Sequence, residues 1–170
     1  MDKKLSRDAK YWIDRFQLET HPEGGYYRQI YKSNQIIPSS ALSDEYNGER
    51  PSATSIYFLL PSGKVSHLHR LASDEVWYHH YGATLTIHTI DQSGDYEPIS
   101  LGPETTNGGT FQALVSGGTI FGATVEEKDT YALVSCMVSP GFTFQDFELL
   151  DSTDLLRQYP QHEAIIKRLT

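Results

Sequence analysis

The chain has 170 residues, of which 38% are hydrophobic and 12% aromatic, so it is long enough to bury the core of one domain. Its formal charge is −8, from 14 lysines and arginines against 22 aspartates and glutamates, which argues against nucleic acid or an anionic membrane as a partner. Its single cysteine, Cys136, excludes an internal disulfide framework and a zinc site built on cysteine pairs.

The composition indicates one all-β domain outside the membrane. No run of about 20 apolar residues occurs, and the N-terminal stretch MDKKLSRDAKYW lacks the apolar core of a signal peptide. Thirteen glycines and eight prolines interrupt a chain rich in tyrosine and phenylalanine, which is typical of a β-sandwich or barrel with many turns. We therefore expect a soluble cytoplasmic protein with a single domain over residues 1–170.

Near the N-terminus, apolar residues recur at the spacing of a helix: Leu5, Ala9, Trp12, Ile13 and Phe16. The pattern predicts an amphipathic helix over about residues 5–18. We expect its apolar stripe to pack on the outside of the sheet, and a helix that binds a partner is the alternative.

Residues 21–31, HPEGGYYRQIY, predict a turn at Pro22 and the following glycine pair, and then a strand from Tyr26 to Lys32. Alternation along the strand would place side chains on opposite faces: Tyr27, Gln29 and Tyr31 on one, and Tyr26, Arg28 and Ile30 on the other. The polar residues 33–52 predict a long loop over one mouth of the barrel.

The central stretch predicts a strand from Ser55 to Leu60 and then a hairpin. Lys64 to Leu71 alternates, residues 72–74 form the turn, and Glu75 to Tyr81 is a run of strand-forming residues. The alternation predicts that His67 and His69 share one face, and that the second strand presents a carboxylate, an imidazole and aromatic rings on one face: Glu75, Trp77, His79 and Tyr81.

This hairpin resembles the first motif of the cupin superfamily, in which a glycine is followed by five residues, His-x-His, three or four residues, a glutamate, six residues and a glycine. Here three residues separate Gly63 from His67, five separate His69 from Glu75, and six separate Glu75 from Gly82. Four segments together resemble one little-characterised branch, cupin family five: HPEGGYYRQIY at 21–31, SIYFLLPSG at 55–63, HRLASDEVWYHHYG at 69–82 and SPGFTFQDFEL at 139–149.

The resemblance covers most of the chain and implies a fold. That fold is an all-β double-stranded β-helix, the RmlC-like cupin jelly-roll barrel, over about residues 22–149. The N-terminal helix and short C-terminal helices over about residues 152–169 would lie outside it. The resemblance also implies a homodimer that pairs or exchanges the HPEGGYYRQIY strand.

The same strand resembles the pocket-lining strand of dTDP-4-dehydrorhamnose 3,5-epimerase, Arg-Gly-aromatic-aromatic-x-Glu-x-aromatic. Gly24 stands in place of the arginine and Gln29 in place of the glutamate, so the substrate need not be the same. This resemblance implies that Tyr27 and Arg28 contact a ligand, with a sugar or sugar nucleotide as one class. The alternative for Arg28 is a solvated strand residue.

The second cupin motif, Pro-x-Gly-x-x-His, supplies a metal-binding histidine in that superfamily. Here SGGTIF at 116–121 occupies its place, and Phe121 replaces the histidine. A metal would therefore be held by His67, His69 and Glu75, with or without His79. We expect no cofactor and take Phe121 as the floor of an organic-ligand pocket, with a divalent metal as the alternative.

The rest of the chain predicts further strands over about residues 83–91, 96–101, 111–115, 130–138 and 142–149. Asp151 or Ser152 can cap the first C-terminal helix, and Pro160 suits the first turn of the second. His88 is expected to be a surface or pairing histidine rather than a ligand.

Candidate catalytic residues follow from these patterns. A neutral imidazole can abstract a proton next to a carbonyl, so His69 is the first candidate for a base. Glu75 would orient it, act as a second acid or base, or bind hydroxyls; the alternative is that the two only satisfy each other. A phenolic acid could come from Tyr27, Tyr57 or Tyr81, a ring could stack on Trp77 or Phe121, and His79 is a further ligand candidate.

Three functions fit this reading, because the cupin fold hosts all of them. The first is a metal-free isomerase or epimerase that acts on a sugar or a related carbonyl compound, with His69 as base. The second is a small-molecule-binding cupin without catalysis. The third is a metallo-cupin that uses His67, His69 and Glu75.

Overall fold

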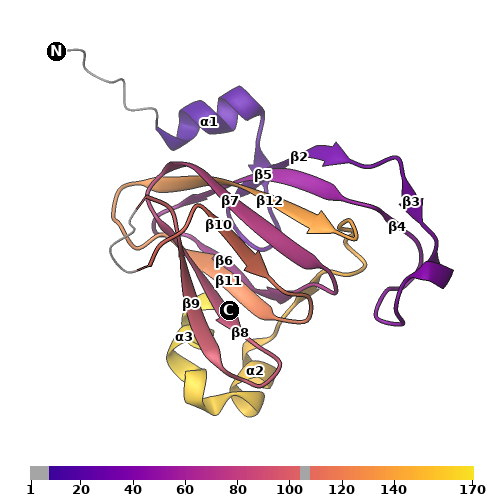
Figure 1. The fold of residues 1–170 in the computed structure, drawn as a ribbon. Helices are drawn as coiled ribbons and strands as arrows, with labels where there is room; N and C mark the ends of the chain where they lie inside the picture. The colour runs from indigo at the N-terminus through magenta and orange to yellow at the C-terminus, as the bar shows by residue number, and fades with distance from the viewer. Residues whose placement is uncertain (1–7, 104–107) are drawn as a thin grey trace.

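The structure, a computed structural model, describes residues 8–103 and 108–170 (Figure 1). Its body consists of two antiparallel sheets that face each other, as the jelly-roll prediction requires. The first sheet has the strand order β1-β2-β5-β12-β7-β10, and its members are β1 (Glu19–Thr20), β2 (Tyr26–Lys32), β5 (Thr54–Pro61), β12 (Tyr131–Ser139), β7 (Asp74–Gly82) and β10 (Gln112–Val115). The second sheet has the order β13-β6-β11-β8-β9, with β13 (Glu148–Leu149), β6 (Val65–Arg70), β11 (Ile120–Thr124), β8 (Leu85–Ile90) and β9 (Tyr96–Leu101).

The apolar side chains of the two inner faces fill the space between the sheets. The residues at the centre of this core are large and almost fully buried: Phe58, Trp77, Leu85, Phe121 and Val134. Burial of these side chains is the main favourable contribution to folding of the barrel. Since the core fills only part of the interior, the remainder is open to polar side chains.

Helices cover the outer faces of both sheets, as predicted. Helix α1 (Ala9–Phe16) lies on the first sheet, where Phe16 stacks on Tyr57 with ring centroids 4.5 Å apart. It begins at Ala9, where Asp8 caps it by accepting a hydrogen bond from the Tyr11 N–H; the predicted start near Leu5 lies outside the described residues.

The C-terminal segments α2 (Ser152–Gln158), η2 (Pro160–His162) and α3 (Glu163–Leu169) cover the second sheet. Their apolar side chains join a second buried cluster: Leu68, Ile90 and Ile120 of the sheet with Leu155, Ile166 and Leu169 of the helices. In the part of the chain that the structure describes, no helix has the length and apolar character needed to cross a membrane.

Two segments differ from the sequence-based expectation. Residues 33–52 contain a short strand pair, β3 (Ile36–Ile37) with β4 (Arg50–Pro51), and the 3₁₀ helix η1 (Ser39–Ala41), rather than a plain loop. The strand predicted over 142–149 is wrong except for β13, because the segment turns back on itself with hydrogen bonds such as Asp146 N–H to Thr143 O. Arg50 is buried and forms an ion pair with Asp146, so the two segments are fastened together.

Bulges in three strands redirect side chains away from simple alternation. In β2 the register shifts between Gln29 and Tyr31, so Lys32, although exposed, is among the residues that line the cavity, whereas Tyr31 is 52% exposed and is not. In β6 a shift opposite β11 puts both Val65 and Leu68 on the helix-covered outer face. The prediction that Tyr31 shares a face with Tyr27 is therefore wrong.

The shift in β7 has the same kind of effect. It falls where His79 and Tyr81 pair with β12, and it turns Tyr81 outward, where its ring stacks on Tyr131 and contacts Trp12 of α1. The prediction that Tyr81 faces the interior together with Glu75 is therefore wrong.

Strand β2 lies near one edge of the first sheet. Strand β1 pairs with it only at Tyr26 and Tyr27, so in the described chain the β2 edge from Arg28 to Lys32 has a paired neighbour, β5, on one side only. The predicted pairing of two copies would use this edge, and it stays a prediction.

Candidate functional site

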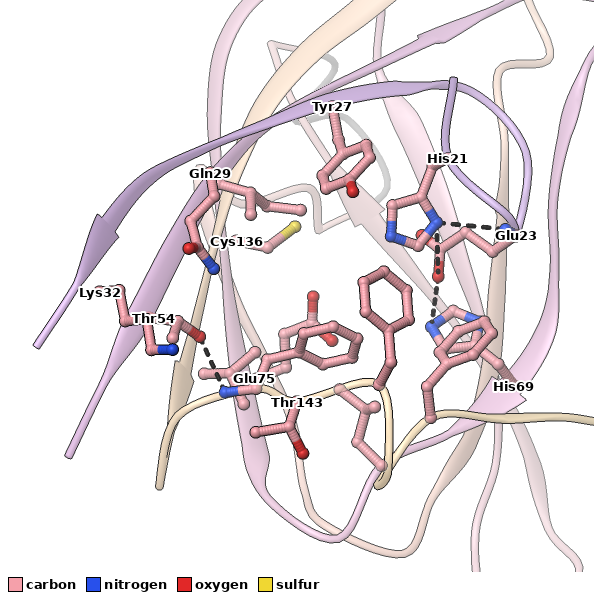
Figure 2. A pocket seen from close by; sticks show the side chains of 16 residues that line it. His21, Glu23, Tyr27, Gln29, Lys32, Thr54, His69, Glu75, Cys136 and Thr143 are labelled. Carbon is pink, nitrogen blue, oxygen red and sulfur yellow. Dashed lines mark hydrogen bonds and ion pairs between the residues drawn. The ribbon is translucent and has the colours of Figure 1, made fainter. Parts of the chain in front are cut away.

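A cavity of about 390 Å³ opens between the two sheets beside the core. Sixteen residues from both sheets, the turn before β2 and the segment after β12 line it (Figure 2): His21, Glu23, Tyr27, Gln29, Lys32, Thr54, Ile56, His69, Leu71, Glu75, Cys136, Val138, Phe142, Thr143, Phe144 and Phe147. This volume is near the lower end of the range for small-molecule sites.

The turn before β2 carries a glutamate, Glu23, into the interior. Gly24 has a φ of +106°, and a Cβ there would lie 2.1 Å from the Val65 carbonyl oxygen, so only glycine allows the turn to approach β6 this closely. The Glu23 carbonyl accepts hydrogen bonds from the His67 N–H (2.6 Å) and from His67 Nδ1 (2.7 Å). These contacts fix the backbone from which the Glu23 side chain extends.

Glu23 forms a buried ion pair with His69. Oε2 of Glu23 lies 2.9 Å from Nε2 of His69, and Nδ1 of His69 donates to the His67 carbonyl at 2.7 Å. Because a carbonyl oxygen only accepts, Nδ1 carries a proton, and one further proton lies between Nε2 and the carboxylate. Both ring nitrogens of His69 are therefore engaged.

The pair shifts the pKa of each partner. Burial alone would lower the pKa of His69, but the charge and hydrogen bond of Glu23 raise it above its ordinary value. Burial alone would raise the pKa of Glu23, but His69 lowers it. His21 lies 3.8 Å from the same carboxylate and accepts the Glu23 N–H at Nδ1, and burial lowers its pKa. At neutral pH this end of the cavity holds an imidazolium–carboxylate pair and a neutral imidazole.

Glu75 is a second buried carboxylate, and within residues 8–103 and 108–170 it forms no ion pair. Burial, and then the negative charge of Glu23, raise its pKa to about 7, although His69 acts in the opposite direction. The Cys136 thiol donates to it, and the pKa of that thiol is raised well above its usual value. Glu75 therefore exists in both the acid and the carboxylate form near neutral pH.

The opposite end of the cavity presents hydrogen-bond donors. Figure 2 shows Lys32, Gln29 and Thr54 together on the side away from His21 and Glu23, with Glu75 between the two groups. Lys32 and Thr54 are register partners in β2 and β5. The Thr54 hydroxyl accepts the Phe142 N–H at 2.8 Å, which leaves its own proton free to donate into the cavity.

Aromatic rings form much of the remaining wall. Phe142 and Phe147 pack against the core, and Phe144 is 55% exposed. The ring of Tyr27 meets His21 edge to face, with centroids 4.5 Å apart. The cavity thus combines polar ends with an apolar, aromatic side.

The structure separates the residues predicted for the site into two groups. His69, Glu75 and Tyr27 line the cavity. The others lie elsewhere: Arg28 donates to Gln17 (2.6 Å), Tyr57 lies under α1, His79 bonds the Ala83 carbonyl (2.9 Å), and Trp77 and Phe121 are buried in the core. Phe121 still supports the site indirectly, because its ring packs 4.1 Å from that of His69.

Sequence reasoning missed most of the polar lining, above all His21, Glu23 and Lys32. One signal was present for Glu23, because a charged residue before a glycine pair lies in a turn that can approach another strand closely. No such signal exists for Lys32, whose position depends on the bulge in β2.

The residues at the cupin metal position do not fit a metal. His67 bonds the Glu23 backbone instead of lining the cavity with His69, both nitrogens of His69 are engaged, and Phe121 occupies the place of the missing histidine. Across residues 8–103 and 108–170, no group of three or more His, Cys, Asp or Glu side chains is arranged to hold a metal ion.

Comparison with known proteins gives consistent results. Residues 10–150 match the family model described as "Cupin superfamily (DUF985)". The chain is 28% identical over 155 residues to the uncharacterized protein YML079W of Saccharomyces cerevisiae, which covers 85% of this chain and 76% of that protein.

Solved structures show the same relationship. A hypothetical protein from Leishmania major superposes with a TM-score of 0.89 at 39% identity, covering 96% of this chain and 99% of the other. Protein SO0799 from Shewanella oneidensis gives 0.87 at 43% identity, covering 96% and 98%. Oxalate decarboxylase of Bacillus subtilis gives 0.54 at 16% identity, covering 89% of this chain and 37% of the other, a likeness of fold alone.

Proposed function

The chain belongs to the DUF985 family of the cupin superfamily, and on that premise we propose that it is a small-molecule isomerase or epimerase that works by metal-free proton transfer next to a carbonyl. One observation carries the proposal. Two buried carboxylates line the same cavity, and the pKa of Glu23 is lowered while that of Glu75 is raised to about 7. Titratable pairs whose pKa values are driven apart are typical of acid–base catalysis.

Glu75 is the base in this proposal. In its carboxylate form it accepts the proton from a carbon next to the carbonyl, and the electron pair of that C–H bond forms a carbon–carbon double bond. A pKa near 7 suits this role, because the carboxylate is populated at neutral pH and still binds a proton strongly. His69, predicted from the sequence as the base, has no free ring nitrogen and is reassigned.

The Glu23–His69 pair is the acid. Its shared proton moves to the carbonyl oxygen as the double bond forms, which yields a neutral enol or enediol. In an isomerisation the pair then takes a proton from the hydroxyl oxygen on the neighbouring carbon of the enediol, while Glu75 delivers its proton to the former carbonyl carbon. In an epimerisation the pair takes its proton back from the same oxygen, while Glu75 returns its proton to the opposite face of the carbon that lost it. Neither outcome consumes a proton. The aromatic wall limits access of water to the intermediate.

The cavity volume narrows the substrate class. At about 390 Å³ the cavity suits a small carbonyl compound, a sugar or an oxo acid, better than a complete sugar nucleotide. The cytoplasmic location predicted from the sequence agrees with a metabolite of this kind as substrate.

Solvent exchange tests the proposal without knowledge of the product. The protein is incubated in D₂O with a panel of small aldoses, ketoses and oxo acids, and deuterium at carbon is followed by NMR. We expect exchange above background for at least one compound. In Glu75→Gln the exchange rate should fall by roughly 100- to 10,000-fold, the usual contribution of a general base.

Glu97→Gln is the matched control, because Glu97 is an exposed residue of β9 outside the cavity. Equal exchange rates in the two variants would remove Glu75 from the reaction. No exchange with any compound, including one that binds, would refute the proposal in favour of a binding protein without catalysis.

A further inference from the structure

Among the described residues that line the cavity, Lys32 is the only lysine or arginine. It is an exposed residue of β2, and the bulge after Gln29 brings it to the cavity, so it lines the cavity while remaining accessible to solvent. Beside it are the amide of Gln29 and the hydroxyl of Thr54 (Figure 2). A cation with two neutral donors is a suitable site for a small carboxylate.

From this arrangement we propose that the substrate is a carboxylic acid, an oxo acid whose carboxylate binds at Lys32, whose carbonyl oxygen accepts the proton of the Glu23–His69 pair, and whose neighbouring carbon faces Glu75. The inference rests on the proposed function for the reaction at Glu75. The binding of the carboxylate at Lys32 does not depend on that reaction and can be measured separately.

The charges within the cavity favour an anion although the chain as a whole carries −8. Glu23 and His69 neutralise each other, and burial lowers the pKa of His21 so that it is neutral. Burial and Glu23 raise the pKa of Glu75 to about 7, so half of it is uncharged near that pH. Lys32 therefore remains without a full anionic counterpart in the cavity, and a carboxylate would supply one.

The lengths of the elements indicate what the rest of the molecule must be. Lys32 lies five positions after Tyr27, which is beside His21, so the two backbone positions are roughly 16 Å apart along a strand. Glu75 lies between these ends, so the reacting carbon must be close to the carboxylate and an apolar group must extend toward the phenylalanines. A 2-oxo acid with an apolar side chain has this order of groups.

A lone ammonium also distinguishes a carboxylate from a phosphate ester. A phosphate group has about two negative charges at neutral pH and is usually bound by several cations or by arginine. With Lys32 alone on this side of the cavity, we expect the singly charged group to bind better.

The test is a titration calorimetry series with three acids and their methyl esters: pyruvate, 2-oxohexanoate and phenylpyruvate. Each ester keeps the shape of its acid and removes the charge. We expect phenylpyruvate and 2-oxohexanoate to bind more tightly than their esters by roughly tenfold or more, as for a charge-assisted hydrogen bond.

In Lys32→Met the acid and its ester should bind about equally, whereas in Lys128→Met the preference for the acid should be unchanged. Lys128 is the matched control because it is an exposed lysine outside the cavity. An equal preference in the two variants would overturn the proposal. So would equal binding of acid and ester, tighter binding of dihydroxyacetone phosphate than of any acid, or no binding of any acid at about 10 mM.

These outcomes are distinguishable from failure of the proposed function. If the protein prefers acids in a way that depends on Lys32 but catalyses no solvent exchange, the carboxylate site is supported and the isomerase proposal is refuted. If deuterium exchanges into a neutral sugar and the protein shows no preference for acids, the isomerase proposal is supported and the carboxylate site is refuted.

Discussion

Two buried histidines flank the same strand, β11, and differ in almost every chemical respect. His69 of β6 pairs opposite Phe121 and lines the cavity, whereas His88 of β8 pairs opposite Gly122 on the helix-covered side. His69 has a carboxylate partner, and its pKa is raised. His88 bonds two neutral hydroxyls, Tyr96 and Thr124, each at 2.8 Å, and burial lowers its pKa.

The difference lies in the partners, since both side chains are buried. Around His88 each hydrogen-bonding group has a match: Thr124 also donates to Glu126, which pairs with Arg168. Around His69 there are two carboxylates, and Glu75 has no cation of its own. Satisfied networks of the first kind stabilise a fold, and a surplus buried carboxylate destabilises it. A loss of folding stability of this kind is typical of a functional site.

The largest expected effect on stability comes from replacing the surplus carboxylate. A pKa raised from 4.5 to about 7 means that the folded protein binds the Glu75 proton more tightly than the unfolded chain does. The associated stability is complete below pH 4.5, is lost as the pH rises through 7, and amounts to about 3 kcal/mol. The unfolding free energy of Glu75→Gln minus that of wild type should therefore increase by about 3 kcal/mol as the pH rises from about 4 to about 8.

Urea unfolding at several pH values measures this gain, and Glu97→Gln serves as the control with no pH-dependent difference. If the difference in unfolding free energy between Glu75→Gln and wild type does not change with pH, the pKa of Glu75 is not raised by folding. The contrast between the two histidine clusters would then fail.

A smaller effect is expected from the satisfied cluster. His88→Ala leaves a small cavity and removes the partner of Tyr96 and Thr124, so the unfolding free energy should fall by about 2 kcal/mol. Solvent exchange should remain within about twofold of wild type, because a structural change on the outer face leaves the proton transfer intact.

The exposed residue His80 offers a matched control. His80→Ala should change the unfolding free energy by less than about 0.5 kcal/mol. A large loss of exchange activity in a folded His88→Ala protein would contradict the assignment of His88 as structural.

The smallest effect is the titration of the two imidazoles themselves. NMR of labelled histidines should place the pKa of His69 above 6.5 and that of His88 below it. In Glu23→Gln the pKa of His69 should fall, because its principal charged partner is gone, while that of His88 should not move. If His69 and His88 have similar pKa values in the wild type, the proposed electrostatic difference between them is wrong.

Much of the fold could be predicted from local patterns. Alternating runs and turn residues predicted the strands, and the resemblance to cupins implied the jelly roll; helical spacing predicted the N-terminal helix, and capping residues the C-terminal ones. Where the prediction was wrong, as for residues 142–149, a long-range contact prevailed: Arg50 fixes Asp146 and holds the segment in turns. Local propensity cannot anticipate a partner 96 residues away.

The sequence by itself was enough to predict the family and the barrel, through the resemblance of four segments to cupins, and the inward-facing positions of His69 and Glu75, through alternation within one hairpin. Only the tertiary structure decided their chemistry. Glu23 reaches His69 because glycine lets a distant turn approach β6, and this contact occupies the nitrogen that a base would need. Lys32 enters the cavity, and His67 is left out of it, because of bulges in the strands. A bulge changes the face of every residue after it, and its position depends on pairing between strands rather than on the residues of one strand.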